Sequence, residues 1–368
     1  MSVQISYKKQ TAFFILSLLV VLAVLESGSR IYEYIQPDCF LIGADATKNL
    51  GTELQNQMCE EIDLLKSNEY PVFENEPNQH LTTININSLG FRGPEFDLIK
   101  NDNTYRIMML GGSTAFGAGA SSDTTTIPAY LEKEFRKNNY NVEVINAGIL
   151  GSDSFEEAYK IRYMFKKFQP DLFIVYDGWN DSFGQVKEGT LNPDITRSKQ
   201  IESEKPSLQI WISKNLTEFR TLYVLYPIFS HILIASTMNE DLLVMNSEIW
   251  SSRWNDVCNE NNDDGIKTII LLQPIVGTGN KKLTPDEKHH ADYIKQIKSR
   301  EQLEYHSKKF LIASCTASID LRNTFDDVSE PIYFDGGHMT DLGNKIIAAK
   351  IFDKIYHDIE IQILNKNK

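Results

Sequence analysis

The sequence predicts a mostly parallel β-sheet with helices on both faces. Two observations indicate this fold. From Thr104 onward, short apolar runs of strand length alternate with longer stretches of helical pattern, and the first and fourth runs end at Gly111-Gly112 and just before Pro274. Reactive groups in such sheets gather beyond the carboxyl ends of the strands, so the residues after each run are where chemistry is expected.

Each element follows from its own pattern. Four apolar runs are typical of buried strands: Arg106–Leu110, Val142–Ile145, Leu172–Tyr176 and Lys267–Leu272. We expect a fifth, short strand near Phe310–Ile312. Helices are predicted at Ile127–Lys137, which Pro128 opens, at Ser154–Phe168, at Pro285–Phe310, and at about Leu342–Ile363.

The N-terminal segment is typical of a membrane anchor or export signal. Lys8 and Lys9 precede an uncharged apolar run, Thr11–Leu25. We expect an uncleaved transmembrane helix, because Arg30–Tyr34 continues the run and its tyrosines suit a membrane interface. A cleaved signal is the alternative. The two lysines favour an N-terminus inside the cell. The rest of the chain is therefore predicted to lie outside the cytoplasm, in the periplasm or the extracellular space.

Three regions are predicted. Residues 1–30 form the anchor or signal, residues 31–103 a polar stalk and lead-in, and residues 104–368 the α/β domain with an insertion at about 183–264. Inside the insertion, Leu216–Ser236 is apolar with aromatic residues. This stretch is interpreted as a core helix, and a lid or interfacial helix over the site is the alternative.

Charge and cysteine content exclude some functions. The net charge of −13 argues against a general nucleic-acid binder, which needs a cationic face. The four cysteines, Cys39, Cys59, Cys258 and Cys315, lack CxxC spacing, so no zinc or other metal site is expected. A Cys39–Cys59 bridge is one of three possible pairings. No motif indicates a cofactor.

Four motifs follow strands or lie near the C-terminus: Gly111-Gly112-Ser113-Thr114, Asn146–Gly151, Gly178-Trp179-Asn180-Asp181 and Asp335-Gly336-Gly337-His338. Each alone has an ordinary explanation as a turn or a cap. Together they offer a serine in a sharp turn, backbone and amide donors beside it, and a histidine. A carboxylate three residues before the histidine can hold Nδ1–H and leave Nε2 free to accept the serine proton.

The order of these motifs resembles that of the SGNH hydrolases, the GDSL-like lipases and acylhydrolases, from about Tyr105 to Ile355. The resemblance implies a three-layer α/β/α sandwich with a flavodoxin-like sheet. It also implies that Ser113 is the nucleophile, His338 the general base and Asp335 the residue that orients it. The Ser113 N–H, the Gly151 N–H and the Asn180 side chain would form the oxyanion hole.

The chain departs from the family pattern at Gly112, where a GDSL motif has aspartate. The nucleophile and its turn remain, but the carboxylate that supports the loop is missing. Asp177 and Asp181, beside the Asn180 motif, are candidates to replace it, although turn capping is the preferred interpretation of both. Asp341 is the rival partner of His338 and is interpreted instead as the cap of the last helix.

The motifs together predict an esterase that works through an acyl-enzyme. The expected substrate is a carboxylic ester on an envelope glycan, such as an O-acetyl group, or on a lipid. Two alternatives remain: an O-acyltransferase that uses the same acyl-enzyme, and a catalytically silent surface protein that keeps the fold.

Overall fold

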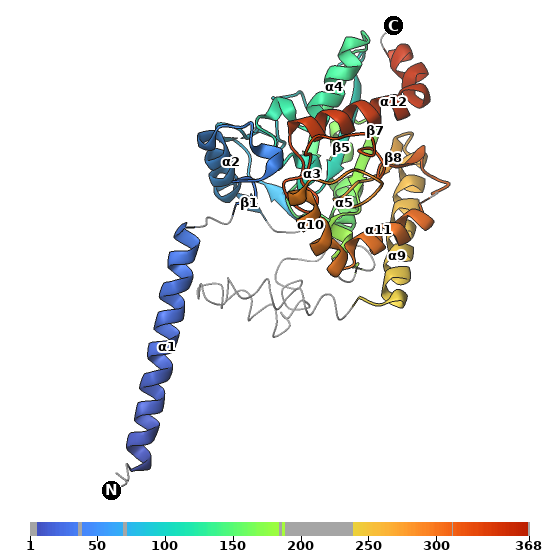
Figure 1. Ribbon diagram of the computed structural model, residues 1–368. Coiled ribbons are helices and arrows are strands. Elements are labelled where there is room, and N and C mark those ends of the chain that lie inside the picture. The colour runs from blue at the N-terminus through green and yellow to red at the C-terminus, as the bar shows by residue number, and fades with distance from the viewer. Residues whose placement is uncertain are drawn as a thin grey trace. The chain divides into compact units, whose positions relative to one another are not determined.

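The computed structural model describes residues 6–35, 39–68, 72–183, 186–187, 238–310 and 312–366 (Figure 1). The chain divides into two compact units. Helix α1 belongs to the first unit, and the described helices and strands after residue 40 belong to the second.

Helix α1 (Tyr7–Ile35) carries the apolar N-terminal segment. Its stretch Tyr7–Ile31 has a mean hydropathy of 2.2 and is not buried, so by length and composition it is able to cross a membrane. The helix continues past the apolar run, where Glu26 and Arg30 pair one turn apart at 2.9 Å. The N-terminal apolar segment is therefore one long helix, as predicted.

The second unit is built on a five-stranded sheet whose strands all run parallel. The strands are β5 (Tyr105–Gly111), β6 (Val142–Gly148), β7 (Leu172–Asp177), β8 (Lys267–Leu272) and β9 (Ala317–Asp320), in the spatial order β6-β5-β7-β8-β9. Every residue of β5 and β7 is buried, as expected for strands covered on both faces. The four strands predicted from apolar runs are confirmed.

Helices cover both faces of this sheet and complete the three predicted layers (Figure 1). Helix α4 (Ile127–Lys137) lies on β6 and packs against α12 (Asp341–Lys366). Helix α5 (Ser154–Lys160) packs against α9 (Glu240–Asp263), which lies on β8. Right-handed crossovers toward opposite edges of the sheet place α4 and α9 on opposite faces.

Two predicted elements are wrong in detail. Phe310 and Ile312 lie in no strand; the fifth strand is β9, a partly exposed and polar edge strand that lacks an apolar signal. The predicted helix Pro285–Phe310 is two helices, α10 (Pro285–Gln296) and α11 (Ser299–Lys308). They are separated at Lys298, whose φ of 59° interrupts the helical backbone.

The residues before the sheet fold onto it. Helix α2 (Thr52–Leu64) is followed by two short antiparallel pairs, β1 (Ser67–Asn68) with β2 (Glu74–Asn75), and β3 (Gln79–His80) with β4 (Asn85–Ile86). Arg92 then bridges Ile86 on one side and Asn146 of β6 on the other. Because β6 is an edge strand, this contact covers part of the sheet edge.

Cys258 of α9 forms a disulfide with Cys315, just before β9. No free cysteine is present among the described residues. Of the predicted insertion, α9 is described, whereas the interpretation of Leu216–Ser236 as a core helix or lid falls outside the described residues.

Candidate active site

Ser113 is the first residue of α3 (Ser113–Phe116), two residues beyond Gly111, the glycine that ends β5. The turn between them leaves no room for side chains. A Cβ on Gly111 would come within 2.5 Å of the Tyr176 carbonyl oxygen, and its φ of 151° also favours glycine. The two glycines therefore allow a sharp strand-to-helix turn with the serine at its tip.

His338 and Asp335 lie in the loop between β9 and α12 and meet the serine there. His338 Nε2 is 2.6 Å from Ser113 Oγ, and His338 Nδ1 is 2.6 Å from Asp335 Oδ2. The other oxygen of Asp335 accepts hydrogen bonds from the Gly337 N–H at 2.8 Å and the His338 N–H at 2.7 Å. The structure thus brings together Ser113, His338 and Asp335, although the serine and the histidine are 225 positions apart in sequence.

The electrostatics of this pair favour its charged form. Burial alone would raise the pKa of Asp335, but His338 and the two backbone amides lower it to about 2. Burial alone would lower the pKa of His338, yet the Asp335 carboxylate and its hydrogen bond raise it above the usual value. The two side chains remain 20% and 16% exposed, so the histidine is reachable from solvent.

Two aromatic side chains pack against the segment that carries the histidine. The Phe334 ring stacks on the His338 imidazole, with centroids 5.8 Å apart and planes 14° apart. A Cβ on Gly336 or Gly337 would come within 2.7 or 2.9 Å of the Trp179 indole, so these glycines allow the indole to lie close to the loop. Sequence reasoning did not identify Trp179 as a support, because the glycines that it contacts are distant in sequence. It also missed Phe334, although this residue lies only four positions before the histidine.

Asn180 begins a short 3-10 turn (Asn180–Ser182) after β7, and its amide points at the serine turn. Asn180 Nδ2 donates to the Ser152 carbonyl oxygen at 2.6 Å. A Cβ on Gly112 would come within 2.3 Å of the same nitrogen. The absence of a side chain at position 112 therefore lets the amide lie directly against the turn that carries Ser113.

Gly151 lies in the turn after β6, with a φ of 75° that suits glycine. The start of this turn is joined to the serine turn, since the Ile149 N–H donates to the Gly111 carbonyl oxygen at 3.0 Å. Gly148 also needs its lack of a side chain, because a Cβ there would meet the Phe116 nitrogen at 2.2 Å. The predicted donors thus come from loops adjacent to Ser113.

Asp177 and Asp181 bracket Asn180 and are buried. The Asp177 carboxylate accepts from the indole N–H groups of Trp250 at 2.7 Å and Trp254 at 3.1 Å, both on α9. Asp181 accepts from the Ser154 N–H at 2.9 Å and its hydroxyl at 2.5 Å. Burial raises the pKa of both carboxyls, and the charge of Asp177 raises that of Asp181 further.

These contacts extend the predicted turn-capping role. Each carboxyl also ties the Asn180 turn to a helix, Asp177 to α9 and Asp181 to α5. The two tryptophans lie 73 and 77 residues away from Asp177, so no local sequence signal could have found them.

The Asp341 carboxylate is bonded to Ser121 and not to His338: it accepts from the Ser121 N–H at 2.9 Å and from the Ser121 hydroxyl at 2.5 Å. Asp341 is the first residue of α12 and ties that helix to the loop after α3, so its predicted role as a simple helix cap is corrected. Asp335 remains the partner of the histidine.

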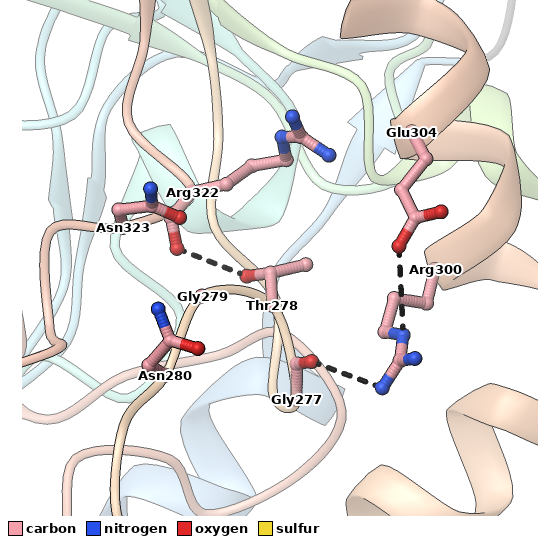
Figure 2. A pocket seen from close by; sticks show the side chains of 8 residues that line it. All are labelled: Gly277, Thr278, Gly279, Asn280, Arg300, Glu304, Arg322 and Asn323. Atoms are coloured by element: carbon pink, nitrogen blue, oxygen red, sulfur yellow. Dashed lines mark hydrogen bonds and ion pairs between the residues drawn. The ribbon is translucent and has the colours of Figure 1, made fainter.

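A separate cavity of about 380 Å³ lies beyond β8, at the turn Gly277–Asn280 (Figure 2). Its arginines already have partners: Arg322 pairs with Asp320 at 2.8 Å, and Arg300 donates to the Gly277 carbonyl oxygen at 3.3 Å. Its lining includes none of the predicted site residues. Within the described residues, no cluster of histidine, cysteine or carboxylate side chains is arranged to hold a metal ion.

No protein-family model matches the sequence, and no curated protein is similar to it. Solved structures similar to the chain include an acetyl xylan esterase, AlAXEase, at 13% identity and a TM-score of 0.40, covering 68% of this chain and 99% of that one. Another is Axe2, an acetylxylan esterase from Geobacillus stearothermophilus, at 13% identity and a TM-score of 0.36, covering 68% and 94%. A third is a two-domain esterase (CEX) active on acetylated mannans, at 13% identity and a TM-score of 0.39, covering 69% and 50%.

Proposed function

We propose that the chain is a serine esterase of the SGNH type, which hydrolyses carboxylic esters through Ser113, His338 and Asp335. The observation that carries the proposal is the continuous hydrogen-bonded line from the serine hydroxyl through the imidazole to the carboxylate, with both distances at 2.6 Å. This arrangement suits nucleophilic acyl transfer, because the base reaches the nucleophile and is itself oriented by an anion.

In the proposed reaction, His338 Nε2 takes the proton of the Ser113 hydroxyl as Oγ attacks the ester carbonyl. The tetrahedral intermediate collapses when the imidazolium gives that proton to the leaving alcohol, which leaves an acyl-enzyme on Ser113. A water molecule, deprotonated by His338, then attacks the acyl carbon and releases the acid. Asp335 stays ionised throughout, since its pKa of about 2 lies far below neutral pH.

The oxyanion is held in this proposal by the Ser113 N–H, the Gly151 N–H and the Asn180 amide. The Asn180 amide has a hydrogen to donate to the oxyanion, because Nδ2 carries two hydrogens and the bond to the Ser152 carbonyl oxygen needs only one. That bond fixes the amide against the serine turn before substrate arrives. Preorganised donors of this kind are usually the largest electrostatic contribution to such reactions.

The proposed location is the outer side of a membrane, with α1 as an uncleaved anchor. Lys8 and Lys9 favour an inside N-terminus. The Cys258–Cys315 disulfide supports an oxidising compartment for the enzyme body. Within reach of an anchored enzyme there, the proposed substrates are acyl groups on envelope glycans or on lipids.

Replacement of the nucleophile tests the proposal. The Ser113→Ala variant should lose hydrolysis of p-nitrophenyl acetate and covalent labelling by a fluorophosphonate. Ser121→Ala is the matched control, because Ser121 is a nearby serine bonded to Asp341 and not to the histidine. Wild-type hydrolysis by Ser113→Ala, or a label mapped to another residue, would show the proposal to be wrong. Product analysis with a sugar acceptor distinguishes hydrolysis from acyl transfer.

A further inference from the structure

Arg92 is a buried cation next to the nucleophile's helix, although it lies before the α/β domain in sequence. Its side chain is 1% exposed. One face of the guanidinium lies over the Phe116 ring, with Cζ 4.9 Å from the ring centroid. A buried arginine must find acceptors for its donors, so the groups that it binds define what it holds in place.

Two of those acceptors are the carbonyl groups at the end of α3. Arg92 Nη1 donates to the Gly117 carbonyl oxygen at 2.8 Å and to that of Phe116 at 3.3 Å. Asn146 Nδ2 adds a bond to the Phe116 oxygen at 3.0 Å. Helix α3 spans only Ser113–Phe116, and one turn of helix is not stable by itself. Donors from outside the turn therefore add to its stability, beside the local bond from the Ala120 N–H to the Gly117 carbonyl oxygen at 2.9 Å.

The rest of the guanidinium is fixed from the other side. Arg92 Nε pairs with Asp123 at 2.9 Å, and Nη2 donates to the Thr83 carbonyl oxygen at 2.8 Å. Asp123 also accepts from the Asn85 N–H at 3.2 Å and its amide at 3.0 Å. The cation thus joins the β3–β4 segment, the loop after α3 and the end of α3 into one rigid cluster.

We propose that Arg92 is a positioning residue for Ser113, so that residues 79–93 support the turn that carries the nucleophile. The proposal rests on the esterase function proposed above. Arg92 touches neither substrate nor the reacting atoms. It holds the far end of the single helical turn whose first residue is the nucleophile, and displacement of that turn moves Oγ relative to His338 Nε2. Misplacement of about 1 Å is enough to cost up to about 100-fold in rate.

The chain contains a matched control in Arg106, whose side chain is 2% exposed. Arg106 pairs with Glu143 at 2.6 Å and donates to the carbonyl oxygens of Asp97, Leu98 and Phe168. It lies at the amino end of β5, whereas Ser113 follows the carboxyl end. Loss of either arginine removes a comparable set of buried bonds, but only Arg92 contacts α3.

The test compares Arg92→Met and Arg106→Met in the full chain in detergent, well below their melting temperatures. Both should lower the melting temperature. Arg92→Met should lower kcat for p-nitrophenyl acetate and the rate of fluorophosphonate labelling together, by about 10- to 100-fold, with KM little changed. Arg106→Met should keep both rates within about two-fold of wild type, since it leaves α3 untouched.

Equal rate losses in the two variants, or wild-type rates in Arg92→Met, would overturn the inference. If Arg92→Met does not fold, the more conservative variant Arg92→Lys tests the positioning role. Lysine keeps the charge but cannot bridge the same carbonyls, so a folded Arg92→Lys should still label several-fold more slowly, and wild-type labelling by this variant would contradict the role. Failure of the wild-type chain to label at Ser113 would instead refute the proposed esterase function.

Discussion

Asp335→Asn removes the charge that holds the imidazole, and its effect on stability is calculable from the structure. The pKa of Asp335 is about 2, against an ordinary value of 3.8. The lowering of the pKa corresponds to about 2 kcal/mol, since one pKa unit is equivalent to about 1.4 kcal/mol. The lowered pKa of Asp335 and the raised pKa of His338 describe one ion pair, so the energy is counted once.

The sign of each shift sets the pH window. A lowered carboxyl pKa stabilises the fold above pH 3.8, and this contribution is lost as pH falls toward 2. A raised histidine pKa stabilises the fold below pH 6.5, and this contribution is lost as pH rises through the folded value. The ion pair therefore contributes most between about pH 5 and 6, and about 1 kcal/mol of that contribution is gone by pH 3.

The assay is urea unfolding of wild type and Asp335→Asn in detergent at pH 5.5 and pH 3. The variant should be about 2 kcal/mol less stable at pH 5.5, and the difference should shrink by about 1 kcal/mol at pH 3. Ester hydrolysis by the variant should fall by about 10⁴-fold at neutral pH, as expected when a triad loses its carboxylate. A stability difference that stays constant between the two pH values would refute the electrostatic reasoning.

Three further predictions test the site and its support. Asn180→Ala should slow kcat by about 100-fold or more with the circular dichroism spectrum unchanged, and a loss under five-fold would exclude the amide as an oxyanion donor. Because the raised pKa of His338 delays formation of the neutral base, kcat/KM of wild type should reach half its maximum above pH 6.5; a midpoint below this value would contradict the ion pair. Cys258→Ser opens a loop of 57 residues and should cost about 4 kcal/mol in urea unfolding, whereas an unchanged midpoint would show that the cysteines are not bonded in the protein.

The sequence predicted the parts of the fold that depend on local pattern. Strands β5 to β8 are apolar because both faces are buried, so each produces a clear run. Strand β9 is partly exposed at the sheet edge and has no such run. The break between α10 and α11 rests on one left-handed lysine, Lys298, which is not a residue type that marks helix ends.

The candidate site likewise contains residues that local motifs predict and residues that they do not. Ser113, Asp335 and His338 were expected from short motifs in a recognisable order, and the structure places them in one hydrogen-bonded line. The supports were missed because each joins segments that are far apart in sequence. Arg92 reaches 25 residues forward to the Gly117 carbonyl, and Trp250 reaches back to Asp177 from a helix beyond the insertion.

The close approach of Asn180 to Gly112 has a consequence for how this site is able to change through evolution. Any side chain at position 112, the aspartate of a GDSL motif included, would occupy the space of the Asn180 amide. Aspartate at position 112 would require Asn180 to shift, so substitutions at these two positions should be coupled as the sequence diverges. Gly112→Asp alone should therefore displace the Asn180 amide from its place beside the serine turn.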